Sequence, residues 1–244
     1  MRRFGLIGFP LGHSFSKKYF TEKFASENIG DATYELYPIE NVLKVKDLLK
    51  ANHEICGLNV TIPHKQSIIP LLNDLSDDAK QIGAVNCISI KNNLLKGFNT
   101  DAPAFEFCLT KFLQPHHKQA LVLGNGGSAA AVKFILKKLS IPFITVTRKA
   151  TEPTQLEYSQ LNDEVINQCP VIINTTPLGM YPQVEFSPRI SYKAITKQHL
   201  LFDLVYNPQQ TSFMNQGLQQ GSTVISGLEM FYKQAELSWE IWNS

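Results

Sequence analysis

The sequence predicts an α/β protein with two domains, and three observations support this fold class. Short apolar runs of strand length alternate with segments of helical spacing along most of the chain, a pattern typical of mostly parallel sheets covered by helices. The glycine-rich stretch 124–129 lies between an apolar run and a helical segment. The chain has 244 residues, which is enough for two domains of ordinary size.

The composition favours a packed, water-soluble enzyme-sized protein over other classes. Apolar residues make up 43% and charged residues 18% of the chain, so disorder is not expected. The net charge of +2 is too small to indicate nucleic acid or a membrane surface as a partner. The four cysteines form no CxxC pair and the histidines show no metal-ligand spacing, so we expect free thiols, no metal and a cytoplasmic location.

The first half of the chain reads as strands separated by helices and one hairpin. Apolar spacing at Tyr19, Phe20 and Phe24 indicates a helix, whereas Lys91-Asn92-Asn93 between two extended runs indicates a tight turn. The predicted strands are 4–8, 34–37, 57–62, 86–90 and 94–98, and the predicted helices are 17–28, 42–51 and 67–75.

The second half begins with a helix over 101–112 and a polar linker over 114–119. Four- and five-residue apolar runs then follow at intervals, as in βαβ units. The predicted strands are 120–123, 143–146, 171–174, 200–204 and 223–225, and the predicted helices are 128–139 and 228–242.

The glycine-rich stretch indicates a dinucleotide-binding domain of the doubly wound, Rossmann type. Gly124 permits a tight turn, Gly126 removes a side chain that would block a pyrophosphate, and Ala129 lets helix and strand approach closely. The helix N-terminus would offer free N–H groups to the phosphates. The predicted binding loop is Gly124, Asn125, Gly126, Gly127, Ser128 and Ala129; the alternative is a plain tight turn.

The end of the next strand bears on the choice between NAD and NADP. A carboxylate there would accept a hydrogen bond from the ribose 2′-hydroxyl of NAD. The chain instead has Thr147, Arg148 and Lys149, whose cations would attract a 2′-phosphate. We therefore expect NADP(H), the alternative being two solvated cations at a strand end.

The stretch NVTIPHK at 59–65 ends an apolar strand with polar groups. Asn59 and Thr61 lie on one side of an extended chain because side chains alternate. Pro63 ends the strand and leaves Lys65 near its carboxyl end, where open α/β sheets bind ligands. The alternative is a solvated lysine after a loop.

Several such stretches together resemble the shikimate dehydrogenase family, in the family's order over most of the chain. The resemblance implies reduction of 3-dehydroshikimate to shikimate with NADPH, on the route to aromatic amino acids. It also implies a substrate-binding domain over 1–101, completed by 226–244, and an NADP-binding domain over 102–225. The matching stretches are GFPLGHSFS (8–16), NVTIPHK (59–65), GAVNC (83–87), NTD (99–101), LGNGGSAAA (123–131), NTTPLGM (174–180), DLVYNP (203–208) and GLEMFYKQA (227–235).

The resemblance implies a role for each matching residue. Lys65 is the catalytic lysine and Asp101 its partner; an ammonium stabilises the negative charge that develops on the carbonyl oxygen. The substrate residues implied are Ser14, Ser16, Asn59, Thr61, Asn86, Tyr206 and Gln234. Those implied near the nicotinamide are Asn174, Thr175, Thr176, Met180, Leu204, Gly227 and Met230.

Some of these residues also have ordinary structural explanations, and the chain departs from the family at several places. Ser14 and Ser16 could cap a helix, Asn86 could serve a turn, and Gln234 could lie on a helix surface. The family usually has Asn-Arg-Thr where this chain has Thr147-Arg148-Lys149, and a second arginine is replaced around Glu152.

Two competing functions follow from this reading. One is an NAD-dependent quinate/shikimate dehydrogenase, because one or two contacts could change the substrate. The other is a non-catalytic NADP-binding protein, against which the presence of both Lys65 and Asp101 argues. The expected partners are a small-molecule substrate and, at most, a second copy of the chain, so that the protein is a monomer or a homodimer.

Overall fold

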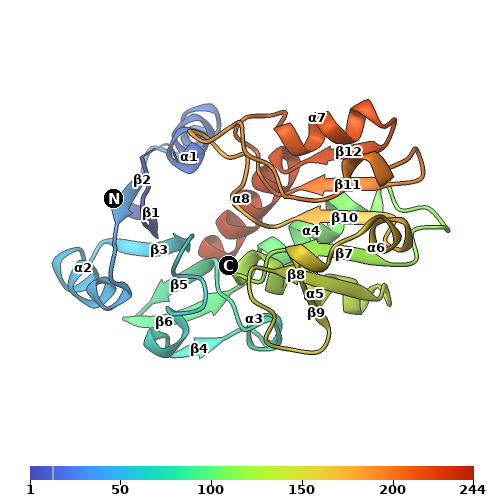
Figure 1. Ribbon diagram of the computed structural model, residues 1–244. Coiled ribbons are helices and arrows are strands. Elements are labelled where there is room, and N and C mark those ends of the chain that lie inside the picture. Colours follow the sequence, from blue (N-terminus) through green and yellow to red (C-terminus); the bar gives the residue numbers. More distant parts are fainter. Residues whose placement is uncertain (13) are drawn as a thin grey trace. The chain divides into compact units, whose positions relative to one another are not determined.

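A computed structural model describes residues 1–12 and 14–244 (Figure 1). The described chain divides into two compact units. Unit 1 comprises Met1–Thr100 with Ala235–Ser244, and unit 2 comprises Asp101–Gln234. Each unit is built around its own six-stranded sheet.

The sheet of unit 1 is mixed, with the strand order β2-β1-β3-β5-β6-β4. Strand β1 runs parallel to β2 and β3, whereas β5 runs antiparallel to β3 and β6. The strands are β1 (Arg2–Gly8), β2 (Ala32–Pro38), β3 (Ile55–Val60), β4 (Asp74–Leu75), β5 (Cys87–Lys91) and β6 (Leu94–Phe98). The helices are α1 (Phe15–Ser26), α2 (Val45–Ala51), α3 (Asp77–Ile82) and the end of α8 (Leu228–Asn243).

The end of α8 belongs to the core of unit 1. The Trp242 ring stacks on Phe4 of β1 with centroids 4.7 Å apart, and its indole N–H donates to the Ile88 carbonyl at 3.0 Å. Lys23 of α1 donates to Glu236 at 2.8 Å, an ion pair that ties α1 to α8. Among the described residues, α8 and every other helix is too short or too polar to cross a membrane.

The sheet of unit 2 is parallel throughout residues 101–234, with the order β12-β11-β10-β7-β8-β9. The order reverses between β7 and β10, as in doubly wound nucleotide-binding folds, so the predicted fold class is confirmed. The strands are β7 (Ala120–Leu123), β8 (Phe143–Thr147), β9 (Gln155–Glu157), β10 (Val171–Asn174), β11 (Leu200–Asp203) and β12 (Thr223–Ser226). The helices are α4 (Asp101–Thr110), α5 (Gly127–Lys138), α6 (Asp163–Gln168), α7 (Ser212–Gln219) and the first part of α8 (Figure 1).

The central strands of unit 2 are buried along their whole lengths. Every residue of β7, β10 and β11 is buried, which is expected for parallel strands covered on both faces. Leu121, Ile172 and Leu201 pack with Phe213 of α7 in one apolar cluster. The polar residues that end β10 and β11, Asn174 and Asp203, are therefore held in a dry environment.

The helix predicted over 67–75 is wrong. Ile69–Leu71 forms only one 3-10 turn, and Asp74–Leu75 then joins the sheet as β4 beside β6. Pro70 lacks the N–H that a continuing helix would need, and the Asn73 side chain accepts a hydrogen bond from Leu95 N at 2.8 Å. Pairing with β6 thus decides the structure of this segment.

Besides β4, three short helices and one short strand of the described residues are missing from the prediction. They are α3, α6, α7 and β9, none longer than eight residues. Each of the three helices begins at a capping side chain, Ser76, Asn162 or Thr211. Such caps are detectable in sequence, but the helices are too short to show a clear apolar period.

Candidate active site

The carboxyl ends of β1 and β3 lie together in unit 1. The two strands are parallel neighbours that end at Gly8 and Val60. Thr61 continues from β3, and its N–H donates to the Ile7 carbonyl at 2.9 Å. Thr61 is therefore fixed at the sheet edge where ligands of open α/β sheets bind.

Lys65 follows this edge in a turn that is anchored on both sides. His64 is buried, and its Nε2 lies 2.5 Å from the Ile39 carbonyl oxygen. A carbonyl oxygen only accepts, so Nε2 carries the ring proton and donates it. The Lys65 carbonyl accepts a hydrogen bond from Val85 N at 2.7 Å. These contacts fix the backbone of Lys65, whose side chain is half-buried.

Asn86 precedes β5 and forms a double hydrogen bond with Thr100. Its Nδ2 donates to Thr100 Oγ1 at 2.9 Å, and its Oδ1 accepts from Thr100 N at 2.6 Å. The Asn86 carbonyl accepts from Asn59 Nδ2 at 3.2 Å. The two predicted asparagines are thus joined, and Thr100, which the sequence analysis missed, orients one of them.

Asn59 is buried and engaged at both ends of its amide. Its Oδ1 accepts from the Tyr34 hydroxyl at 2.9 Å, and its Nδ2 also donates to Ser238 Oγ at 2.9 Å. Ser238 lies on the part of α8 that belongs to unit 1. Asn59 therefore connects β3 to β2 and α8, and this holds the polar side of β3 in place.

Ser14 and Ser16 lie at the start of α1. Ser14 is the helix N-cap, and its Oγ accepts from Ser16 N at 3.2 Å. Ser16 is buried. Ser14 thus has the capping role that the sequence suggested as an alternative. Because its Oγ acts as an acceptor in the cap, the hydroxyl proton can still be donated to a ligand.

Asp101, Tyr206 and Gln234 belong to unit 2. Asp101 is buried at the first turn of α4, where the positive end of the helix dipole stabilises a carboxylate. Burial raises the pKa of Tyr206 to about 12, and the charge of Asp101 adds to this effect. The Tyr206 ring stacks on Phe231 at 4.6 Å, and Gln234 Nε2 donates to the Phe231 carbonyl at 2.9 Å.

The glycine-rich loop connects β7 to α5 at the point where the strand order reverses. Gly124 has a φ of +110°, and a Cβ there would lie 2.6 Å from Thr175 Oγ1. Gly126 is the N-cap of α5, and a Cβ there would have no atom within 4 Å. Open space above Gly126, at the N-terminus of α5, fits a dinucleotide pyrophosphate.

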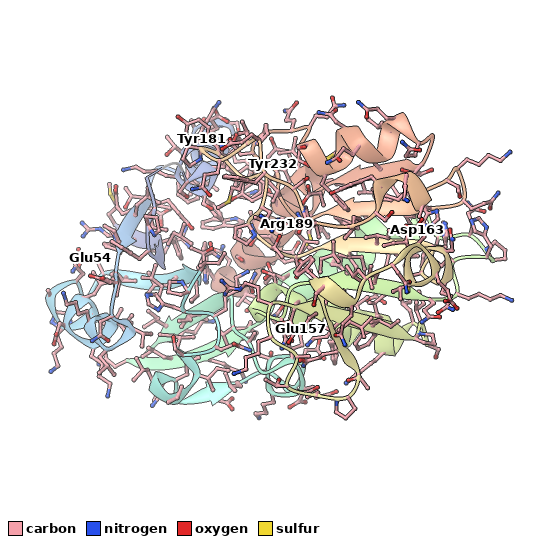
Figure 2. The ribbon with its side chains drawn as sticks, viewed as in Figure 1. Glu54, Glu157, Asp163, Tyr181, Arg189 and Tyr232 are labelled. Carbon is pink, nitrogen blue, oxygen red and sulfur yellow. The ribbon has the colours of Figure 1, made fainter. Side chains whose placement is uncertain are left out.

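Thr147 ends β8, the neighbour of β7, and Arg148 and Lys149 follow it. Both cations are exposed. The segment that they begin is held by Ala150 N, which donates at 3.3 Å to Glu157 of β9, a residue labelled in Figure 2. In a doubly wound fold this strand end lies beside the adenosine ribose.

The ends of β10 and β11 are joined by a buried polar network. Asn174 Nδ2 donates to Asp203 Oδ1 at 2.9 Å, and Thr211 Oγ1 donates to Asp203 Oδ2 at 2.5 Å. Asn174 Oδ1 accepts from the N–H and the hydroxyl of Thr176, at 3.0 and 2.6 Å. Thr175 Oγ1 donates to the Leu123 carbonyl at 2.7 Å. The loop after β10 is thus fixed against β7 and β11.

The remaining predicted cofactor residues lie on neighbouring segments of unit 2. Met180 is 42% exposed, whereas Met230 is buried on α8. Leu204 N donates to the Asn174 carbonyl at 3.0 Å. Gly227 N donates to the Val205 carbonyl at 3.3 Å, so the chain entering α8 lies against the segment after β11.

The structure therefore gathers the predicted residues into two sets, one in each unit. Unit 1 holds Ser14, Ser16, Asn59, Thr61, Lys65 and Asn86, and unit 2 holds Asp101, Tyr206, Gln234 and all of the predicted cofactor residues. The sequence analysis missed Thr100, Asp203 and Thr211, which orient predicted residues. A signal for Asp203 was present, because an acidic residue ends the apolar strand LLFD.

Comparisons with known proteins identify the family of this chain. Residues 6–88 match the family model described as the shikimate dehydrogenase substrate binding domain. A shikimate dehydrogenase (NADP(+)) of Clostridium beijerinckii is 38% identical over 99% of this chain and 92% of the relative.

Two solved structures show the same fold over the whole chain. Shikimate dehydrogenase 1 from Peptoclostridium difficile matches with a TM-score of 0.87 and 34% identity, covering 100% of this chain and 92% of the other. The enzyme from Thermus thermophilus, solved in complex with NADP(H) and shikimate, matches with a TM-score of 0.84 and 29% identity, covering 99% and 93%. By this similarity along its length, the chain belongs to the shikimate dehydrogenase family.

Proposed function

We propose that this protein catalyses the reversible, NADPH-dependent reduction of 3-dehydroshikimate to shikimate, a step toward the aromatic amino acids. The observation that carries the proposal is the family membership along nearly the full chain, together with the presence of Lys65, Asp101 and the glycine-rich loop. The alignment with the relative from Clostridium beijerinckii covers both units of the chain.

Unit 2 fits NADP(H). The fit rests on the order of its strands, on the open space at Gly126 and on the N-terminus of α5 that follows it. We assign Arg148, which is exposed after β8, to the 2′-phosphate. When bound, NADPH supplies the hydride that reduces the substrate carbonyl.

Unit 1 fits a small carboxylate that bears hydroxyl groups. Such a substrate needs short polar side chains instead of an apolar pocket. We assign Ser14 and Ser16 to the substrate carboxylate, and Thr61 and Asn86 to its hydroxyl groups. Asn59 lies on the same polar side of β3, with its amide held by Tyr34 and Ser238.

Lys65 and Asp101 are assigned the proton chemistry. The Lys65 ammonium stabilises the negative charge that develops on the carbonyl oxygen and can supply a proton to it. The Asp101 carboxylate favours the charged lysine and accepts a hydrogen bond from a substrate hydroxyl. Tyr206 and Gln234, from unit 2, complete the proposed substrate contacts.

We further propose a domain division that follows the chemistry, with residues 1–101 and 226–244 binding substrate and residues 102–225 binding NADP. The free thiols of Cys56, Cys87, Cys108 and Cys169 fit the reducing conditions of the cytoplasm. We propose a monomer or a homodimer for the active form.

One observation favours a second candidate, an NAD-dependent quinate/shikimate dehydrogenase. Glu152 lies exposed in the segment after β8, where a carboxylate would accept from the ribose hydroxyl of NAD and repel a 2′-phosphate. Arg148 in the same segment has the opposite preference, and we therefore retain NADP in the main proposal.

A steady-state assay distinguishes these functions. The purified protein is mixed with shikimate or quinate and with NADP⁺ or NAD⁺ at alkaline pH, and the reduced nicotinamide is followed by its absorbance. The proposal expects kcat/KM to be highest with shikimate and NADP⁺. A higher value with quinate and NAD⁺ would establish the second candidate, and no turnover with any pair would contradict both.

A further inference from the structure

Lys133 is a half-buried cation beside the glycine-rich loop that the site described above does not use. It lies in the middle of α5, six residues after Gly127. Helical side chains lean toward the N-terminus, and six residues span about 9 Å of helix axis. A lysine at this position can therefore reach back to the loop at the start of its own helix.

The contacts of Lys133 show that it does so. Its Nζ donates to Asn125 Oδ1 at 2.7 Å, and Asn125 is the second residue of the loop. An amide oxygen is uncharged, so this hydrogen bond fixes the ammonium without neutralising it. Within residues 1–12 and 14–244, the ion pairs of this chain include none made by Lys133.

The electrostatics of Lys133 favour an additional anion. Burial lowers the pKa of Lys133, while Glu152 partly opposes this effect and Lys137 adds to it. A half-buried ammonium without a close carboxylate gains more from an arriving anion than a fully solvated one, because it has already lost part of its hydration.

The charged groups near Lys133 indicate on which side of the loop its ammonium lies. Glu152 belongs to the segment that begins with Arg148 at the end of β8, and it interacts electrostatically with Lys133. Strand β8 flanks β7 on the side away from β10. In a doubly wound fold that side holds the adenosine ribose, whereas the nicotinamide lies across the strand-order reversal.

We infer that Lys133 is a specificity-determining residue that contacts the 2′-phosphate of NADP together with Arg148. This inference rests on the proposed function only in taking NADP(H) as the cofactor. Asn125 holds the ammonium in position. Lys133 and Arg148 together explain how the segment that contains Glu152 remains compatible with a 2′-phosphate.

Equilibrium binding tests the inference without substrate. NADPH and NADH are titrated by their nicotinamide fluorescence against the wild-type protein and Lys133→Met. We expect NADPH affinity to fall about tenfold or more, as for loss of a charge-assisted hydrogen bond, and NADH affinity to change less than about twofold. Competition by 2′,5′-ADP should weaken in parallel with NADPH, and competition by 5′-AMP should not.

Three further variants separate charge from structure. Lys137→Met removes an exposed lysine four residues along the same helix and should leave both affinities unchanged. Lys133→Arg should retain NADPH affinity within about threefold. Lys133→Gln can keep a hydrogen bond to Asn125 without charge, so it should lose NADPH affinity as Lys133→Met does. It also replaces Lys133→Met as the neutral variant if circular dichroism shows that Lys133→Met is misfolded.

The outcomes distinguish this inference from the proposed function. An equal loss for NADPH and NADH would place Lys133 at a phosphate common to both and overturn the inference. Unchanged NADPH affinity in both neutral variants would overturn it as well, while leaving the function intact. A wild-type protein that does not prefer NADPH would contradict the proposed cofactor before any variant is examined, and the inference would fail with it.

Discussion

Asn174 donates a hydrogen bond of 2.9 Å from its Nδ2 to Oδ1 of Asp203, and both side chains are fully buried. The bond joins the last residues of the adjacent strands β10 and β11. The same oxygen accepts from Val205 N at 3.0 Å, and the other carboxyl oxygen accepts from Thr211. One buried carboxyl group thus organises the loops that follow both strands.

Asp203 should make the stability of the protein depend on pH. Burial raises the pKa of Asp203 to about 6 from an ordinary value of 3.8, although hydrogen bonds from Thr211, Val205 and Asn174 oppose the shift. The folded state therefore binds more protons than the unfolded state between these values. The stability that protonated Asp203 contributes is fully present below pH 3.8, and it is lost as pH rises through about 6.

Asp203→Asn removes this titration and keeps the volume of the side chain. We expect the free energy of unfolding of the wild type, relative to that of the variant, to fall by about 2 to 3 kcal/mol between about pH 4 and pH 7. Urea unfolding at several pH values measures the difference. Parallel pH profiles for the two proteins would contradict the raised pKa.

Thr211→Val should destabilise unit 2. The substitution removes the hydroxyl that donates to Asp203 and that also accepts from Met214 N as the cap of α7. Because a helix cap and a hydrogen bond to a buried carboxyl group are both lost, we expect the free energy of unfolding to fall by about 2 kcal/mol. Thr211→Ser keeps the hydroxyl and should recover most of the stability in the same urea experiment. Equal stability of the valine and serine variants would count against this network.

Two alanine substitutions in the glycine-rich loop should have different effects. Gly124→Ala forces a side chain into a backbone with φ of +110° and against Thr175, so we expect a loss of at least about 1 kcal/mol of stability. Gly126→Ala meets no atom within 4 Å and should fold normally. Its methyl group would occupy the space proposed for the pyrophosphate and weaken NADPH binding about tenfold.

Thermal unfolding and fluorescence titration of both loop variants check this prediction. The informative comparison is between them, because each serves as the control for the other. Gly126→Ala with unchanged NADPH affinity would argue against pyrophosphate binding at this loop. Gly124→Ala with unchanged stability would argue against the strained turn.

Lys65→Met should abolish most turnover and spare cofactor binding. The variant removes the ammonium proposed to stabilise the developing oxyanion, so we expect kcat to fall by about 100-fold to 10,000-fold. Lys65 is assigned to the substrate and not to the cofactor, so NADPH affinity should change less than about twofold. Lys50→Met, at an exposed lysine of unit 1, is the matched control. Turnover that survives in Lys65→Met would remove the lysine from the mechanism.

Most of the regular structure was predictable because it depends on neighbours in the chain. The apolar runs that became β7, β10 and β11 are short and β-branched or leucine-rich, and the loop between β7 and α5 carries its glycines in order. The helix predicted over 67–75 failed because pairing of Asp74–Leu75 with β6 outweighed local propensity.

The sequence by itself determined the fold class, the glycine-rich turn between β7 and α5 and the family, since each depends on residue types at short spacings. Only the tertiary structure decided that Asp203 holds Asn174, that Thr100 orients Asn86, and that the ammonium of Lys133 returns to Asn125. Asn59 and Ser238 are 179 residues apart in the chain and still share a hydrogen bond. Such partners are chosen by packing, because a buried polar group must find its donor or acceptor wherever the fold brings one within reach.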